Sequence, residues 1–215
     1  MNDLGGRAAS LLTGIAVALV IVAVAIIPFL SMRWIAFEQE RSQAAAWTGF
    51  TPEELRTATG AIVNDLVWGP PGFDVEVGGV AVLNEREQQH MRDVRTVFMG
   101  LFAAAAVSVV VLLVASRRRD RVRLWRSVRR GALGLIVGTV ILGGVALVAF
   151  DQLFEAFHRV FFPAGSYLFD PATERLVQLF PFQFWQATAM AVGAVIISLA
   201  LLSAWLAGRR GTAAR

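Results

Sequence analysis

Uncharged, largely apolar residues collect in four blocks of the sequence, and polar segments separate these blocks. The blocks cover residues 11–30, 97–116, 131–150 and 186–207, and none of them contains a charged side chain or a histidine. A run of about 20 apolar residues is long enough to cross a hydrocarbon core roughly 30 Å thick. Because a backbone surrounded by lipid has to satisfy its own hydrogen bonds, each block is expected to form a helix.

The four blocks predict an α-helical integral membrane protein, with one membrane domain covering residues 1–215. The first block is longer than the ~7–15 apolar residues of a signal peptide, so we expect it to be a retained membrane helix. The predicted transmembrane helices span about residues 10–32, 95–116, 130–151 and 184–208.

Arginine supplies all 20 basic residues, and its distribution predicts the topology. Residues 116–130 carry eight arginines and one aspartate. Residues 33–96 carry six arginines against ten acids, and residues 151–185 carry two against four. Arginine-rich segments stay on the cytoplasmic side. The net charge of +4 therefore reflects topology and does not indicate a nucleic-acid partner.

This charge pattern places both termini in the cytoplasm and the two acidic segments outside. The expected segments are a cytoplasmic loop at about 117–129 and outer segments at about 33–94 and 152–183.

The first outer segment predicts a small helix, a β-hairpin and a further helix. Thr51 followed by Pro52 and two glutamates is typical of a helix start, and this helix should run to about Leu66. Gly78-Gly79 stands between two short valine-containing runs and predicts a two-residue hairpin turn. No helix breaker follows Asn84, so we expect a helix to begin there and to continue into the second membrane helix.

The second outer segment opens with the amphipathic run DQLFEAFHRVFF at residues 151–162. Leu153, Phe154, Phe157 and other apolar residues can share one face of a helix. This run is either an extension of the third membrane helix or an amphipathic turn lying in the outer interface.

Gly134 and Gly138 form a G-x-x-x-G pattern inside the third block. This spacing allows membrane helices to approach closely. We expect these two glycines to serve ordinary packing inside the bundle.

His90 and His158 are the only histidines in the chain. His90 lies seven residues before the second block, and His158 lies eight residues after the third. If both helices continue at a rise of ~1.5 Å per residue, the two imidazoles lie roughly 10–12 Å beyond their blocks, on the same side of the membrane. The short loop between the blocks makes the two helices antiparallel neighbours, so the imidazoles are able to meet at the outer interface.

Histidine changes charge between pH 5 and 8, which suits it to proton transfer at neutral pH. Glu87 and Asp93 lie three residues from His90, and Glu155 lies three residues before His158. Such carboxylates either orient an imidazole and raise its basicity, or serve as solvated ion-pair partners. A metal site built from histidines and acids is the weaker alternative, because no H-E-x-x-H spacing occurs and the chain has no cysteine.

Four motifs together resemble the four-helix bacterial lipoprotein intramolecular transacylase family. They are ERE-x-x-HM-x-DV around His90, FH-x-x-FF around His158, and then LFDPAT and LFPFQFW before the last block. The resemblance covers almost the whole chain. It implies an enzyme that acts on diacylglyceryl-modified lipoproteins among the membrane lipids, at the outer face of the bacterial cytoplasmic membrane.

The resemblance further implies that the enzyme moves an acyl chain from the sn-2 glycerol oxygen to the α-amino group of the lipid-bearing cysteine. The product is a lyso-form lipoprotein. No cofactor or metal is implied, and the family's two catalytic histidines correspond to His90 and His158. The candidate orienting or substrate-positioning residues are Glu85, Arg86, Glu87, Asp93, Asp151, Glu155, Tyr167 and Asp170. The candidate acyl-chain contacts are Phe154, Phe157, Phe161 and Phe162.

The chain departs from the family pattern between the second histidine and the last block. The family usually has an Asn-Asp pair and a tryptophan where this chain has Ala164-Gly165 and Tyr167. Glu174 stands where aspartate is common. If the missing polar pair orients the substrate, activity or substrate preference differs in this protein.

Two other interpretations remain open from the sequence. One is a non-catalytic membrane scaffold or regulator of the same fold that binds lipids or lipoproteins. The other is a different interfacial lipid enzyme, such as a histidine-assisted or metal-assisted hydrolase. The apolar blocks contain no charged residue, which argues against a transporter.

Overall fold

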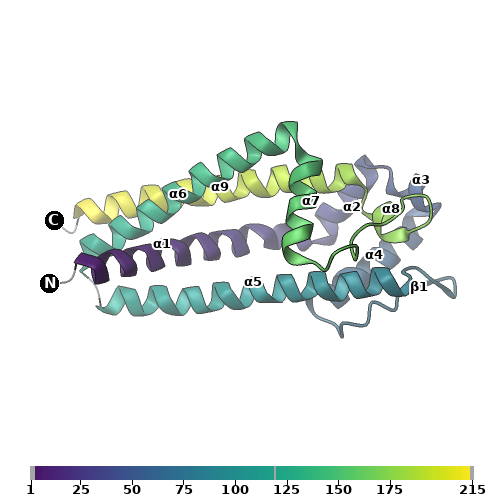
Figure 1. Ribbon diagram of the computed structural model, residues 1–215, viewed down its shortest axis with the longest axis horizontal. Coiled ribbons are helices and arrows are strands. Elements are labelled where there is room, and N and C mark those ends of the chain that lie inside the picture. The colour runs from purple at the N-terminus through teal and green to yellow at the C-terminus, as the bar shows by residue number, and fades with distance from the viewer. Residues whose placement is uncertain (1–2, 119, 214–215) are drawn as a thin grey trace. The chain divides into compact units, whose positions relative to one another are not determined.

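Most of the chain is helical in the computed structural model, which describes residues 3–118 and 120–213 (Figure 1). Within these residues, four helices are long and apolar enough to cross a membrane, and they contain almost all of the four apolar blocks. The predicted fold class, a four-helix integral membrane protein with a small additional helix and a β-hairpin, is therefore confirmed. The elements are α1 (Asp3–Ile26), the 3-10 helix η1 (Ile27–Leu30), α2 (Met32–Arg41), α3 (Ala44–Thr48), α4 (Pro52–Val67), β1 (Glu76–Val77), β2 (Val80–Ala81), α5 (Glu85–Arg118), α6 (Arg121–Val148), α7 (Phe150–Phe161), α8 (Arg175–Leu179) and α9 (Phe182–Ala213).

The chain divides into two units by its backbone contacts. The bundle unit contains α1, α5 from Gly100, α6 through Leu147 and α9 from Met190. The mixed unit contains residues Pro28–Met99 and Val148–Ala189, and it holds the short helices, the hairpin and both histidines.

In the bundle unit, the backbones of α1 and α6 approach closely at Gly14 and Gly131. A Cβ atom added to Gly131 would lie 2.5 Å from the Cα atom of Gly14, so only glycine fits there. Gly134 and Gly138 have no other atom within 4 Å of such a Cβ, so the expectation that they serve packing inside the bundle is wrong. The core beside this crossing consists of Val17, Ile21, Ala25, Ala132, Ile196, Ala200 and Ala204.

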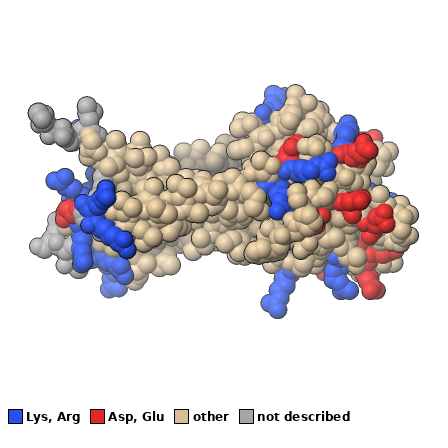
Figure 2. All heavy atoms as spheres, turned by 90° about the horizontal axis from the view of Figure 1, so that it is seen from below, with Lys and Arg blue, Asp and Glu red and all other residues tan. Residues whose placement is uncertain are grey.

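The bundle unit carries its charges separately from its apolar surface. Figure 2 shows arginines gathered at the end of the bundle unit that holds the α5–α6 junction, next to a long surface of uncharged side chains. Leu113, Val137 and Leu202 are examples of exposed apolar residues in the bundle unit. Such a surface suits lipid, because a soluble protein rarely exposes so large an apolar area.

The third membrane helix differs from its predicted boundaries at both ends. α6 already begins at Arg121, so the arginine-rich segment expected as a loop is mostly helical. Ala149 leaves the helical conformation, with φ −147° and ψ 45°, and α7 starts anew at Phe150.

The break at Ala149 decides between the two structures expected for residues 151–162. An extension of the third membrane helix is wrong, and the segment forms the separate amphipathic helix α7. Val160 and Phe161 lie on its exposed face, whereas Phe150 and His158 are buried.

In the mixed unit, α4, the hairpin and the start of α5 form where local sequence signals predict them. Thr51 and Glu54 make a reciprocal capping box at the start of α4, with Pro52 in the first position. Gly78 and Gly79 both have positive φ, and they form the two-residue turn that pairs Glu76 with Ala81 and Val77 with Val80. α5 begins at Glu85 and continues unbroken to Arg118, as predicted from Asn84 onward.

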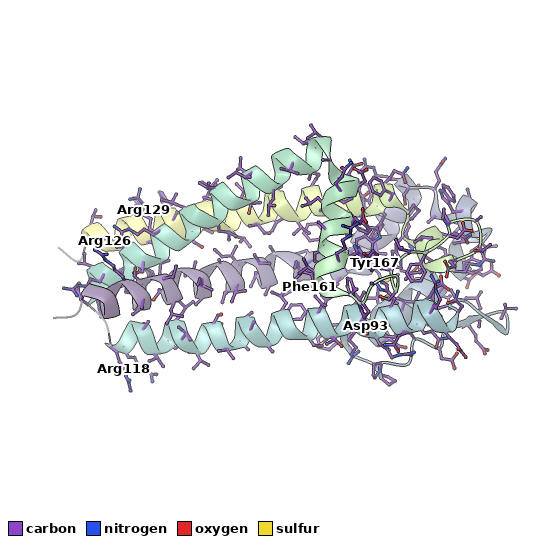
Figure 3. The ribbon with its side chains drawn as sticks, in the orientation of Figure 1. Asp93, Arg118, Arg126, Arg129, Phe161 and Tyr167 are labelled. Atoms are coloured by element: carbon purple, nitrogen blue, oxygen red, sulfur yellow. The ribbon has the colours of Figure 1, made fainter. Side chains whose placement is uncertain are left out.

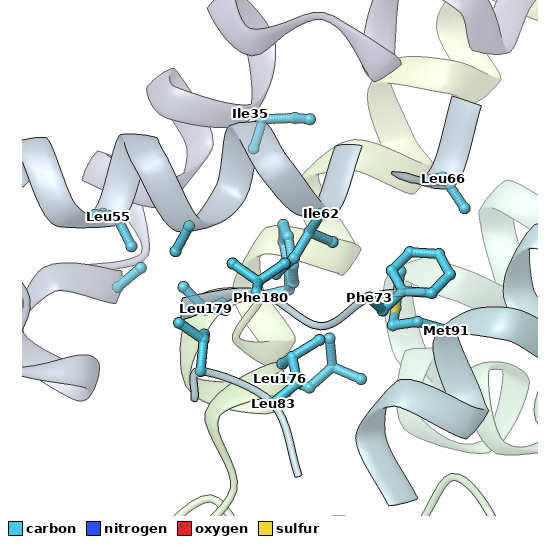
Figure 4. Close-up of a cluster of buried hydrophobic side chains, with 14 of the residues drawn as sticks. Ile35, Leu55, Ile62, Leu66, Phe73, Leu83, Met91, Leu176, Leu179 and Phe180 are labelled. Carbon is cyan, nitrogen blue, oxygen red and sulfur yellow. The ribbon is translucent and has the colours of Figure 1, made fainter. Parts of the chain in front are cut away.

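An apolar core holds the mixed unit together (Figure 4). Ile62 of α4, Phe73 of the following loop and Leu179 of α8 are almost completely buried in it. Burying side chains of this size contributes about 1.5–3 kcal/mol each. The buried Gln39 side chain of α2 donates to Leu179 O and to the Thr59 hydroxyl, at 3.0 Å in both cases. These contacts join α2, α4 and α8 to one another.

Candidate active site

His90 lies near the start of α5, in a stretch whose geometry is set by a cap. The Asn84 side chain accepts from the backbone N–H of Glu87 at 3.0 Å, and Glu87 Oε2 accepts from the backbone N–H of Asn84 at 2.7 Å. This reciprocal pair satisfies two N–H groups at the helix start. His90 follows one turn later and is only 6% exposed.

His158 lies in the last turn of α7 and is 9% exposed. Its Nδ1 atom lies 2.7 Å from the carbonyl oxygen of Phe154, one turn earlier. A carbonyl oxygen only accepts, so Nδ1 carries the proton and the neutral ring keeps its lone pair on Nε2. This hydrogen bond thus leaves His158 Nε2 able to accept a proton.

The structure brings the two imidazoles together. Their ring centroids lie 5.9 Å apart, and the ring planes differ by 18°. His90 Nδ1 is the one buried side-chain polar atom, among the described residues, without a hydrogen-bond partner. Leaving such an atom unpaired costs about 1–3 kcal/mol, which a bound polar group would offset.

Aromatic rings surround the pair on several sides. The Phe162 ring lies 4.8 Å from the His90 ring and 5.2 Å from the His158 ring, measured between centroids. Phe169 contacts His90 at 5.3 Å, and Tyr167 contacts His158 at 5.1 Å. Figure 3 marks Tyr167 in the loop that follows α7. The site therefore combines two imidazoles with an apolar wall.

Burial lowers the pKa of His158 below its ordinary value of 6.5, and the hydrogen bond to the Phe154 carbonyl offsets part of this shift. The uncharged ring is thus the dominant form at neutral pH. A neutral imidazole with a free Nε2 lone pair is the form that can accept a proton in catalysis.

The carboxylates that flank the histidines in sequence have other partners. Glu87 is buried, and its Oε1 accepts from the backbone N–H of Leu176 at 2.6 Å, which ties α5 to α8. Asp93 accepts from the Gln89 side chain at 3.1 Å. Glu155 forms an exposed ion pair with Arg159 at 2.5 Å. Across the described ranges, none of these three acids hydrogen-bonds to a histidine.

The remaining candidate positioning residues fall into two groups. Arg86 and Asp170 belong to a network that holds the loop between α7 and α8, and Tyr167 lies in that loop against His158. Glu85 and Asp151 are exposed on their helices.

The four candidate acyl-chain contacts also separate into two groups. Phe154 and Phe162 pack directly against the imidazoles, and Phe162 is buried. Phe157 and Phe161 are 46% and 50% exposed, and the Phe157 ring also lies 5.5 Å from the His158 ring, measured between centroids.

Two residues that shape the site are not among the predicted candidates. Phe169 contacts His90 by its ring, and Asn84 caps the helix that carries His90. The Asn84-x-x-Glu87 spacing is a readable capping signal. Nothing in the local sequence around Phe169 indicates its contact with a residue 79 positions earlier.

The described residues contain no group of three or more His, Asp or Glu side chains placed to hold a metal ion. The two histidines therefore lack a third metal-binding side chain among the described residues.

The fold and the site together define a four-helix integral membrane protein with a buried pair of histidines. A model of the lipoprotein intramolecular transacylase family, Lit, matches residues 11–185. The chain therefore belongs to the Lit family, and the family resemblance of the sequence motifs is confirmed.

Solved structures give the same fold. The lipoprotein intramolecular transacylase Lit from Bacillus cereus has a TM-score of 0.77 and 16% sequence identity, over 97% of this chain and 97% of that chain. A form of that protein with one histidine replaced by arginine has a TM-score of 0.74 and 15% identity, over 95% and 91% of the two chains. No curated protein sequence matches the chain significantly.

Proposed function

We propose that this protein moves the sn-2 acyl chain of a diacylglyceryl lipoprotein to the α-amino group of its N-terminal cysteine. Membership of a transacylase family supports an acyltransferase that acts on lipoproteins. The observation that carries the finer proposal is the buried imidazole pair, in which His158 has a free Nε2 lone pair and His90 has an unpartnered Nδ1. One group is ready to take a proton, and the other is ready to bind a polar atom of the substrate.

In the proposed reaction, the amine nitrogen attacks the sn-2 ester carbonyl carbon. His158 Nε2 takes the proton that the nitrogen loses. The C–O bond to glycerol then breaks, and the glycerol oxygen receives a proton from the imidazole pair. His90 donates a hydrogen bond to the ester carbonyl oxygen, which gains negative charge during the attack. One amide forms, one hydroxyl is freed, no atom is gained or lost, and both imidazoles end in their starting forms.

Nucleophile and ester belong to the same lipoprotein molecule. The protein mainly has to hold the two groups in a reactive geometry, since positioning alone supplies about 7–11 kcal/mol in well-oriented intramolecular reactions. No protein nucleophile is needed, which agrees with the absence of cysteine from the sequence. The exposed phenylalanines of α7, Phe157 and Phe161, offer an apolar surface for the acyl chains.

The proposed location is the bacterial cytoplasmic membrane, with both termini in the cytoplasm and the histidine pair at the outer face. The diacylglyceryl substrate is held in the membrane by its acyl chains, and His90 belongs to α5, a helix that is itself long and apolar enough to cross a membrane. The arginine distribution of the sequence supports this orientation.

The test uses a host whose lipoproteins are diacylated and keep a free amine. Wild type is expressed beside His158→Ala, and N-terminal lipopeptides are analysed by tandem mass spectrometry with amine labelling, because intramolecular transfer leaves the total mass unchanged. Wild type should give a blocked amine bearing one acyl chain, with one chain left on glycerol, and the variant should not. Free amines in both strains, at equal amounts of folded protein, would favour the scaffold interpretation.

A chelator separates the metal-assisted hydrolase from this proposal. The transfer should proceed at the same rate in excess chelator, because no step needs a metal ion. Loss of activity that a divalent cation restores would support the hydrolase instead.

A further inference from the structure

The loop that joins α7 to α8 has two turns and a short central segment. Ser166 donates its backbone N–H to Pro163 O at 3.1 Å in the first turn, and Glu174 donates to Asp170 O at 2.8 Å in the second. Between the turns lie Tyr167, Leu168 and Phe169. Tyr167 contacts one imidazole and Phe169 contacts the other. The central segment therefore covers both histidines.

Arg86 holds this segment at its midpoint. Its Nη2 atom donates to the carbonyl oxygen of Leu168 at 2.7 Å, and Leu168 is the residue between the two aromatic rings. The guanidinium carbon also lies 5.3 Å from the centroid of the Phe169 ring. Arg86 precedes His90 by four residues and thus lies on the same face of α5, one turn earlier.

Glu174 completes the anchor at the far end of the loop. Its Oε1 atom lies 3.4 Å from Arg86 Nη2, and its Oε2 atom accepts from the backbone N–H of Asp170 at 2.7 Å. The Asn84 side chain donates to Glu174 Oε1 at 3.3 Å. Arg86 is therefore connected to both the middle and the end of the loop.

A transacylase has to prevent a competing reaction with water. A water molecule next to the ester and the base could attack the same carbonyl carbon. The ester C–O bond would break, the glycerol oxygen would take a proton, a free fatty acid would leave, and the amine would stay unmodified. Closing a site against water prevents such side reactions.

We propose that Arg86 is a positioning residue that holds Tyr167 and Phe169 over the two imidazoles and thereby keeps water from the ester. The inference rests on the proposed acyl transfer and adds how the site selects the amine as nucleophile. Its specific consequence is a change of product when the Arg86 contact is lost.

The experiment compares wild type, Arg86→Gln and Arg92→Gln, each purified and placed in lipid vesicles with a diacylglyceryl lipopeptide that has a free amine. The reaction runs in ¹⁸O-labelled water, so that hydrolysis marks the released fatty acid with one ¹⁸O atom. Arg92 is the matched control, because it also donates from α5 to a loop carbonyl, Gly72 O at 3.1 Å, but belongs to another loop.

In Arg86→Gln, the ratio of labelled fatty acid to N-acyl product should rise about tenfold or more over wild type, as expected for loss of a hydrogen bond from a charged donor. Arg92→Gln should keep the wild-type ratio. Arg86→Lys should lie between the two, because an ammonium can still donate to Leu168 O but lacks the planar fork that also reaches Glu174.

An unchanged ratio in Arg86→Gln would overturn the inference, and so would loss of the N-acyl product without any labelled fatty acid. If Arg86→Gln does not fold, Phe169→Leu provides the second test, because it removes the aromatic ring that contacts His90. It has to give the same rise in the ratio of labelled fatty acid to N-acyl product. Failure of wild type to form any N-acyl product would instead overturn the proposed function, which separates the two failures.

Discussion

The two imidazoles have the same side chain but different hydrogen-bonding environments. His158 is fixed by the Phe154 carbonyl, whereas His90 has a buried nitrogen without a partner in the described part of the chain. This asymmetry assigns the base to His158 in the proposed reaction.

Replacing His158 with asparagine tests the role of Nε2 with little change in packing. The asparagine amide can donate to Phe154 O much as Nδ1–H does, but it has no basic nitrogen. We expect the rate of N-acylation to fall at least about 100-fold, the usual contribution of a general base. The melting temperature should change little. Retention of activity within tenfold of wild type, at equal expression, would assign the proton transfer elsewhere.

The ionisation of His158 can be followed by ¹⁵N NMR, because the chain has only two histidines. Burial lowers the pKa of His158, so its titration midpoint should lie below pH 6.5. The base is then present at neutral pH and is lost as the pH falls through that midpoint. The neutral ring should carry its proton on Nδ1. Assignment uses a His90→Gln sample, and a midpoint above 6.5 or a proton on Nε2 would contradict the assignment.

Among the helices, local sequence patterns do not indicate where two helices approach closely or where a buried polar side chain joins them. α1 and α6 meet at Gly14 and Gly131, and α5 is joined to α8 by the buried Glu87 carboxylate. Both contacts link elements far apart in sequence. The close approach occurs at Gly131, three residues before the G-x-x-x-G pattern, whereas added Cβ atoms at Gly134 and Gly138 would meet open space.

Alanine at Gly131 should destabilise the bundle unit, because its Cβ would fall 2.7 Å from Gly14 O and the two helices would have to separate. We expect a melting temperature several degrees lower in detergent, a shift typical of about 1–3 kcal/mol for overpacking. Gly134→Ala and Gly138→Ala are the matched controls, since their added methyl groups meet open space. Equal melting temperatures for all three variants would show that the close approach does not form.

At the scale of the whole molecule, the proposed function requires the histidine pair to lie at the outer face of the membrane. The bundle unit carries the arginines at the α5–α6 junction, and the mixed unit carries most of the acids. The charge difference between these segments predicts the orientation, since arginine is retained on the cytoplasmic side.

Single cysteines can test this orientation cleanly, because the natural chain contains none. Glu53→Cys and Ala172→Cys should react with a membrane-impermeant maleimide added to intact cells. Arg123→Cys should react only after the membrane is permeabilised. All three positions are exposed, so access depends on the side of the membrane. The opposite pattern of labelling would invert the proposed topology.

Local patterns were sufficient for most of the fold. The capping signal at Thr51, the glycine pair at residues 78–79 and the unbroken run after Asn84 each gave an element in the predicted place. The matched positions of His90 and His158 also suggested that the two rings meet, although the continuous third helix assumed for this was wrong. Neither proline nor glycine occurs at the break at Ala149, so the local sequence does not predict it.

The sequence by itself determined the four membrane helices, the charge asymmetry and the identity of the two histidines, because hydrophobicity, capping and side-chain chemistry act over a few neighbouring residues. Only the tertiary structure decided that Glu87 binds Leu176 and not His90, that Phe169 and Tyr167 each cover one imidazole, and that Arg86 holds them there. The Tyr167–His158 contact spans nine positions. The other contacts join residues about 80 to 90 positions apart, and only the packing of the mixed unit brings them within hydrogen-bonding or ring-contact distance.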